Sequence, residues 1–200
     1  MSTVFVKSYE APYVSERDIL RYAGVKETND QITGLLSDAV KMTEGILTYK
    51  VCYGEFDLSF IEDTVCFGSF SCTSASLSKA LCGCKRAVVF AATVGVGIDR
   101  LIAKYERVSP SLAHMINSFG VERIESLCDT FCREMSLSLE KRGEMLLPRF
   151  SAGYGDLDIE TQKDIFRVLD VSKKIGACLT EGMLITPTKS VTAIAGIKQA

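Results

Sequence analysis

The sequence predicts an α+β fold: a single domain with a twisted antiparallel or mixed sheet and several helices, one of them long. Three observations lead to this prediction. Strand-like and helix-like segments are mixed along the chain without strict alternation. The apolar run at residues 87–94 is typical of a central, buried strand. After Ser109-Pro110, a pair that favours a helix start, apolar residues at helical spacing continue for about 30 residues, until Gly143.

Capping residues and periodicity place the other elements. The first half predicts a strand at 3–8, a helix capped by Ser15, a helix capped by Asn29, strands at 48–56 and 63–67, and a short helix at 76–81. The second half predicts a helix near 99–105, an extended segment at 144–150, a loop at 151–158, a helix capped by Asp158, and extended stretches at 178–185 and 190–197. No linker or repeat divides residues 1–200, so one domain is expected.

Composition narrows the class of protein. Apolar residues make up 47% of the 200 residues, enough for a sizeable core, and the formal net charge is −2. Without a long basic run, a nucleic-acid partner is not expected. No apolar stretch reaches the ~20 residues that span a bilayer, and the N-terminus does not look like a signal peptide. We therefore expect a cytoplasmic protein without a membrane partner.

Eight cysteines leave two interpretations open. In a chain this large and apolar, reduced and mostly buried thiols are favoured over a disulfide framework. Alternatively, the pairs Cys82/Cys84 and Cys128/Cys132 are halves of a metal or redox site, although the first pair is too closely spaced for common zinc fingers.

Two other features argue against particular activities. Gly95-Val96-Gly97 follows the buried strand as a phosphate-binding loop would, but it lacks the third glycine of the dinucleotide fingerprint and a Walker lysine. We interpret it as a tight turn. His114 is the only histidine, which gives little support to a Ser-His-Asp or Cys-His hydrolase.

The segment at 149–154, R-F-S-A-G-Y, carries the strongest candidate site. Arg149 presents a planar fork suited to a carboxylate. Ala152 and Gly153 have minimal side chains, so a planar ligand can lie against their backbone, and Tyr154 offers a ring with a hydroxyl tip. From the residues alone, an ordinary glycine turn beside a surface arginine remains an alternative.

With its neighbours, this segment resembles the activation domain of cobalamin-dependent methionine synthase, in a stand-alone form. The motif R-x-x-x-G-Y is followed by an acidic-capped helix, by I-G-x-x-L-T-E at 175–181 and by P-x-x-S-V at 187–191. Upstream, A-A-T-V-G at 91–95 and the long helix with Glu125 and Asp129 also match. The resemblance is strongest over residues 84–197, and the N-terminal third matches only loosely.

The resemblance implies a role for each matching residue. Arg149 would hold the methionyl carboxylate of S-adenosylmethionine, and Ala152 and Gly153 would let the adenosyl group approach. Tyr154 would lie near the corrin face, as the residue closest to the chemistry. Glu125 would lie near the cationic end of the ligand, with Glu122, one turn earlier, as the alternative alignment. Gly155-Asp156 replaces the proline usual after Gly-Tyr, which predicts a more flexible loop.

The implied function is that of an S-adenosylmethionine-binding accessory for reductive methylation of cob(II)alamin. A methionine synthase or related corrinoid methyltransferase would supply the cobalamin, because this chain lacks the D-x-H-x-x-G motif of corrinoid carriers. A flavodoxin or ferredoxin would donate the electron. The family domain continues beyond the S-V segment with further tyrosines. A module that docks on a corrinoid protein without binding S-adenosylmethionine is therefore a second hypothesis, and a cysteine-based metal or redox protein is a third.

Overall fold

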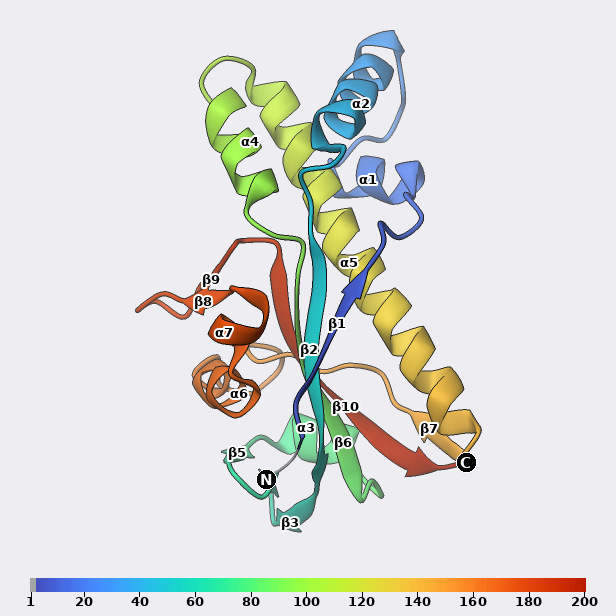
Figure 1. Cartoon of the computed structure of the whole chain (residues 1–200), viewed down its shortest axis with the longest axis vertical. Coiled ribbons are helices and arrows are strands. Elements are labelled where there is room, and N and C mark those ends of the chain that lie inside the picture. Colours follow the sequence, from blue (N-terminus) through green and yellow to red (C-terminus); the bar gives the residue numbers. More distant parts are fainter. Residues whose placement is uncertain (1–2) are drawn as a thin grey trace.

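The computed structural model describes residues 3–200 and confirms the α+β class (Figure 1). Its main sheet is antiparallel throughout, in the order β1-β2-β6-β10-β7. These strands are β1 (Phe5–Tyr9), β2 (Tyr49–Asp57), β6 (Arg86–Thr93), β10 (Ser190–Gln199) and β7 (Glu144–Leu146). Two smaller sheets comprise β3 (Ser59–Ile61), β4 (Thr64–Cys66) and β5 (Ser71–Thr73), and the pair β8 (Cys178–Leu179) and β9 (Ile185–Thr186).

The helices cover both faces of the main sheet. They are α1 (Glu16–Tyr22), α2 (Asp30–Thr43), α3 (Ala75–Ala80), α4 (Gly97–Tyr105), α5 (Pro110–Glu140), α6 (Thr161–Leu169) and α7 (Val171–Ile175). Helix α5 runs along the molecule and packs against α1, α2 and α4 near its beginning, as Figure 1 shows. The predicted long helix is confirmed, with Pro110 as its first residue.

The central strand β6 explains the uninterrupted apolar run. Its side chains alternate between the two faces of the sheet. Val88, Phe90 and Ala92 belong to the apolar cluster that includes α5, whereas Val89 and Ala91 belong to the cluster that includes α6 and α7. Both faces are therefore buried, which accounts for the uninterrupted apolar residues between Arg86 and Thr93 at the two ends of the strand.

The structure corrects several predicted boundaries. The stretch at 178–185 is a hairpin of two short strands, because the chain reverses between Thr180 and Leu184, whose backbones are hydrogen-bonded. Ser109 occupies the N-cap of α5, but its side chain makes no capping bond. The N-cap of α6 is Glu160, not the predicted Asp158. The Asp158 side chain instead accepts a hydrogen bond from the backbone N–H of Glu160, at 2.9 Å. Strands β3 and β5 and helix α7 were not predicted.

The Gly95-Val96-Gly97 turn owes its glycines to a close backbone approach. A Cβ on Gly95 would lie 2.4 Å from Thr48 Oγ1, and Gly95 has a φ of +82°. A Cβ on Gly97 would lie 2.4 Å from the Ile46 carbonyl oxygen. Since side chains at either position would collide with the segment before β2, the tight-turn interpretation accounts for both glycines without a ligand.

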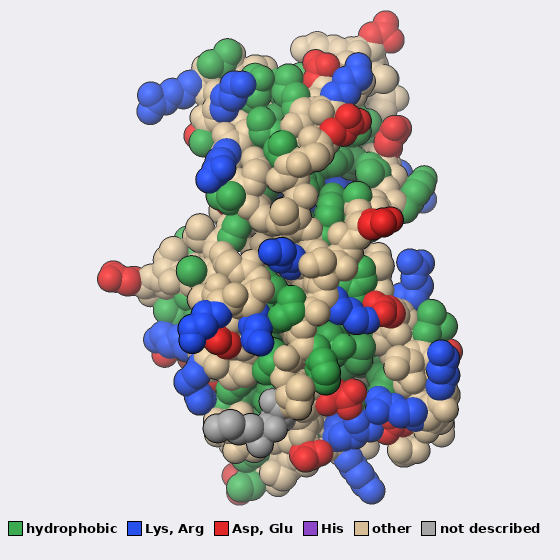
Figure 2. All heavy atoms as spheres, viewed as in Figure 1, with side chains coloured by type: hydrophobic (Ala, Val, Ile, Leu, Met, Phe, Trp, Pro, Cys, Tyr) green, Lys and Arg blue, Asp and Glu red, His purple; other side chains and the backbone are tan. Residues whose placement is uncertain are grey.

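The surface shows mixed charge. Basic and acidic side chains are interspersed on the face shown in Figure 2, as the net charge of −2 suggests. None of the helices in residues 3–200 is both long and apolar enough to cross a membrane.

Candidate functional site

Arg149 is held at the edge of the main sheet by its neighbour in the chain. The backbone of Phe150 forms an antiparallel bridge with Ile194 of β10, with hydrogen bonds of 2.7 and 2.8 Å. Phe150 packs into the apolar cluster on the α6 side. Successive side chains of an extended segment point to opposite faces, so Arg149 is directed toward α5.

On α5, Arg149 meets two carboxylates. Its Nη2 donates to Glu125 Oε2 at 2.6 Å and to Asp129 Oδ1 at 3.0 Å. Glu125 and Asp129 are four residues apart and therefore share one face of the helix. The other terminal nitrogen, Nη1, is buried and has no hydrogen-bond partner. The guanidinium is thus positioned on one side and unsatisfied on the other.

The loop after Arg149 is tied down by Asp156. This carboxylate accepts hydrogen bonds from the Ser74 hydroxyl at 2.5 Å and from the backbone N–H groups of Ala75 and Ser76 at the start of α3. The Ser74 hydrogen bond, followed by those from Ser76 and Ala75, lowers the pKa of Asp156 from 3.8 to about 2. Asp156, in the Gly-Asp that replaces the family's proline, thus anchors the loop to α3, and greater flexibility of this loop stays a prediction.

A cavity of about 550 Å³ lies beside Arg149, a size typical of small-molecule sites. Four parts of the chain line it: Glu125 of α5, the segment at 149–154, Gln162 at the start of α6, and the β9–β10 segment with Ile185 and residues 190–192. Of the five predicted site residues, Arg149, Glu125, Ala152 and Tyr154 line this cavity together.

Gly153 and Tyr154 have different surroundings. Gly153 has a φ of +84°, and a Cβ there would lie 3.0 Å from Ile159 Cδ1, so the turn itself requires glycine. Its role in ligand approach stays a prediction. Tyr154 is 73% exposed and contacts the Phe150 ring edge-on, with centroids 6.4 Å apart. The Tyr154 ring thus borders the cavity while remaining open to a partner.

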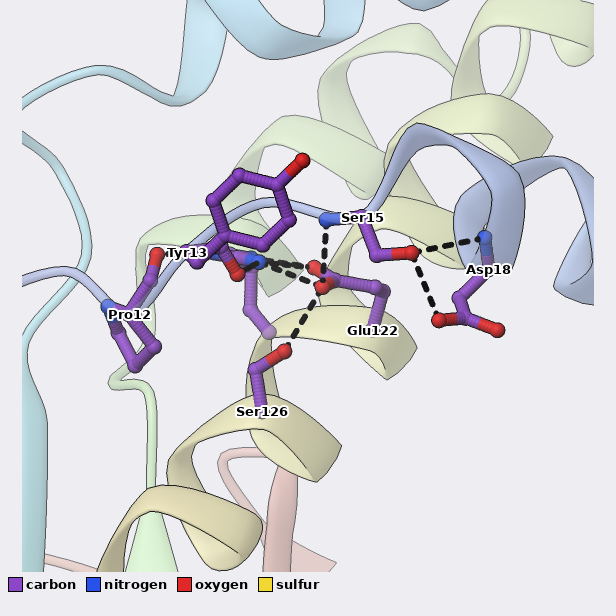
Figure 3. Close-up of polar contacts among 7 residues, drawn as sticks. Pro12, Tyr13, Ser15, Asp18, Glu122 and Ser126 are labelled. Carbon is purple, nitrogen blue, oxygen red and sulfur yellow. Dashed lines mark hydrogen bonds and ion pairs between the residues drawn. The ribbon is translucent and has the colours of Figure 1, made fainter.

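The alternative alignment, Glu122, has a different setting (Figure 3). Its side chain is 2% exposed and accepts hydrogen bonds from the Ser15 backbone N–H at 3.0 Å and the Ser126 hydroxyl at 2.8 Å. It also pairs with Arg123, which is fully buried and donates to the carbonyl oxygens of Pro12 and Tyr13. Glu122 therefore fastens the segment before α1 to α5, and Glu125 is the glutamate that reaches the cavity.

A second cavity, of about 610 Å³, lies on the other side of α5 near β1 and β2. Its only arginine is Arg123, each of whose guanidinium nitrogens already has a partner. Its other basic lining residue is Lys50, so this larger cavity offers no unpaired guanidinium donor, and the cavity beside Arg149 is the stronger candidate for a ligand held by an arginine.

Sequence reasoning missed Gln162 and the β10 residues Val191 and Thr192 as cavity residues. A glutamine near a helix start gives no signal of a site, and its position depends on how α6 packs against the sheet. Ser190, which also lines the cavity, lies in the P-x-x-S-V motif. Glu181 of the L-T-E motif is exposed between β8 and β9 and does not line it.

The cysteines do not assemble into a metal site. All eight are free, and within residues 3–200 no group of three or more His, Cys, Asp or Glu side chains could hold a metal ion. Burial raises the pKa of Cys128 to about 12 and also raises that of Cys132. Both thiols are therefore neutral near pH 7 and poorly suited to metal ligation or nucleophilic attack.

The architecture matches a solved structure described as the MetH reactivation domain bound to AdoHcy. The match has a TM-score of 0.71, covers 97% of this chain and 78% of the other, and has 16% sequence identity. The chain has the fold of the MetH reactivation domain. Because the match covers almost the whole chain, it includes the N-terminal third, where the sequence resemblance was loose. No family model and no curated protein matches the sequence.

Proposed function

We propose that this chain binds S-adenosylmethionine in the cavity beside Arg149 and supports reductive methylation of a cobalamin held by a partner protein. The partner would be a methionine synthase or a related corrinoid methyltransferase. The observation that carries the proposal is Arg149 Nη1, a buried donor without a partner in a residue that lines a cavity of about 550 Å³. Buried donors normally have a hydrogen-bond partner, so we expect a ligand acceptor such as a carboxylate to bind this nitrogen.

The charges around Arg149 suit the amino-acid end of this ligand. One guanidinium and two carboxylates, Glu125 and Asp129, give the site a formal charge of −1. S-adenosylmethionine carries a carboxylate, an ammonium and a sulfonium, hence a net charge of +1. The ligand carboxylate would accept from Nη1, while its cationic groups would lie near the acidic pair.

The remaining walls suit the nucleoside. Ala152 has a minimal side chain, and Ile185 and Val191 present apolar surface on which the flat base can lie. The loop that follows Arg149 is held by Asp156, so this wall is preorganised. Tyr154, at the exposed border of the cavity, would contact the partner's corrin.

In this reaction the sulfonium methyl group is the methyl donor, the partner's cobalt is the acceptor, and an electron comes from a reductant such as a flavodoxin or ferredoxin. The residues of this chain bind and orient the donor, and no protein nucleophile is required. The cofactors thus carry the difficult chemistry, consistent with a site that has an arginine and carboxylates but no reactive thiol.

Isothermal titration with S-adenosylmethionine and S-adenosylhomocysteine tests the proposal. The wild-type protein should bind both, and Arg149→Ala should weaken binding by about 10- to 100-fold, as expected for a charge-assisted hydrogen bond. Arg142→Ala is the matched control, because Arg142 also pairs with two carboxylates, Glu55 and Glu144, but does not line the cavity. If the wild-type protein binds neither compound, even with a corrinoid protein present, the docking hypothesis replaces this one.

A further inference from the structure

Two residues that line the same cavity each have a buried polar atom without a hydrogen-bond partner. In the described part of the chain, three buried side-chain atoms lack a hydrogen-bond partner: Glu144 Oε2, Arg149 Nη1 and Gln162 Oε1. Glu144 Oε2 lies 3.3 Å from Arg142 Nε in an ion pair. The other two belong to residues that line the cavity of about 550 Å³. Because buried polar groups are normally paired, both atoms point to a ligand that supplies their partners.

Gln162 is held in place by its surroundings. It is the second residue of α6 and is only 6% exposed. Its Nε2 donates to the Met183 carbonyl oxygen, a long contact of 3.4 Å, which orients the amide. One N–H of the amide is therefore used, while the other N–H and the Oε1 acceptor are available.

Gln162 and Arg149 approach the cavity from different sides. Arg149 is bonded to α5, whereas Gln162 belongs to α6, and these helices pack in the clusters on opposite faces of the sheet. A ligand that satisfies both atoms must carry an acceptor, such as an anionic group, for Arg149 and a separate hydrogen-bond donor for Gln162. S-adenosylmethionine has this form, with its carboxylate and its base at opposite ends.

We infer that Gln162 recognises the amino edge of the adenine base and makes the cavity selective for adenosyl ligands; this rests on the proposed function. A glutamine amide is complementary to adenine, because its oxygen accepts from the 6-amino group while its N–H donates to an adjacent ring nitrogen. Ile185 and Val191 provide apolar contacts for the faces of the base. Hypoxanthine carries a carbonyl at position 6, so its oxygen would face Gln162 Oε1, and two acceptors cannot form a hydrogen bond with each other.

Titration with S-adenosylhomocysteine and S-inosylhomocysteine tests this inference. The wild-type protein should prefer the adenosyl compound by about tenfold or more. Gln162→Met, which keeps the length of the side chain, should bind S-adenosylhomocysteine about tenfold more weakly and should lose the preference. Gln31→Met replaces an exposed glutamine of α2 and should change neither value.

Thermal unfolding of Gln162→Met separates recognition from a structural role. Oε1 has no partner within the protein, and the Nε2 hydrogen bond to Met183 is long, at 3.4 Å, so loss of the amide should lower the unfolding temperature only slightly. Equal affinity of the wild-type protein for the two compounds, or an unchanged preference in Gln162→Met, would overturn the inference while leaving the proposed function intact. Failure of the wild-type protein to bind S-adenosylhomocysteine at all would instead remove the proposed function, and this inference with it.

Discussion

Two arginine–glutamate pairs, each with its glutamate on helix α5, differ in how completely their polar atoms are satisfied. Glu122 and Arg123 are 2% and 0% exposed, and their partners come from the segment before α1 and from α5 itself. Glu125 and Arg149 border a cavity, with exposed side-chain fractions of 39% and 25%, and Arg149 Nη1 has no partner. The two glutamates are only three residues apart. The pair Glu122–Arg123, whose guanidinium nitrogens all have partners, is called the closed pair, and the pair Glu125–Arg149, with Nη1 unpaired, is called the open pair.

The completeness of its hydrogen bonds separates a structural ion pair from one that can bind a ligand. A buried ion pair whose hydrogen bonds are complete fixes the packing of two elements, but it has no capacity left for a ligand. An ion pair beside a cavity, with one donor unused, is positioned without being saturated. Spacing along the helix does not distinguish the two cases, whereas the partners of each polar atom do.

The largest expected effect is on stability at the closed pair. Glu122→Ala leaves Arg123 buried without its carboxylate and removes the acceptor of the Ser15 N–H. Loss of one partner of a buried ion pair costs about 3–5 kcal/mol, so the free energy of unfolding in urea should fall by that amount. Glu140→Ala, at an exposed position of the same helix, is the control and should change it by less than about 0.5 kcal/mol.

A loss below about 1 kcal/mol in Glu122→Ala would mean that the closed pair contributes little to packing. The Glu122–Arg123 pair would then lack the structural role that distinguishes it from the Glu125–Arg149 pair.

The open pair should show a smaller effect, on binding rather than on folding. Glu125→Gln should change the free energy of unfolding by less than about 1 kcal/mol, because the pair is partly exposed. It should reduce the preference for S-adenosylmethionine over S-adenosylhomocysteine about two- to fivefold, since the sulfonium loses a nearby carboxylate. Titration of both compounds gives this ratio, with Glu140→Gln as the control. An unchanged ratio would place the sulfonium away from Glu125.

The framework of the fold could be predicted from local signals. The run at 87–94 and the long periodic stretch after Pro110 correspond to β6 and α5, because an uninterrupted apolar strand and a sustained helical stripe each have one favourable structure. Strands β3 and β5 and helix α7 were missed because they are only three to five residues long. Elements this short depend on tertiary contacts more than on their own sequence.

The candidate site was predictable only in part. Arg149, Ala152 and Tyr154 lie close together in the sequence, so a short motif could indicate them. Glu125 could be distinguished from Glu122 only once the partners of each were known. Gln162 depends on Met183, 21 residues away, and Asp156 on the start of α3, about 80 residues away. Such contacts follow from packing rather than from spacing.

A crystal structure of the protein with S-adenosylhomocysteine would show whether Arg149 holds the ligand. We expect the homocysteine carboxylate at about 2.7–2.9 Å from Arg149 Nη1, with the adenine at Gln162. Arg123 should keep the partners it has in the free protein. A ligand bound beside Arg123, or one that leaves Arg149 Nη1 without an acceptor, would contradict the account.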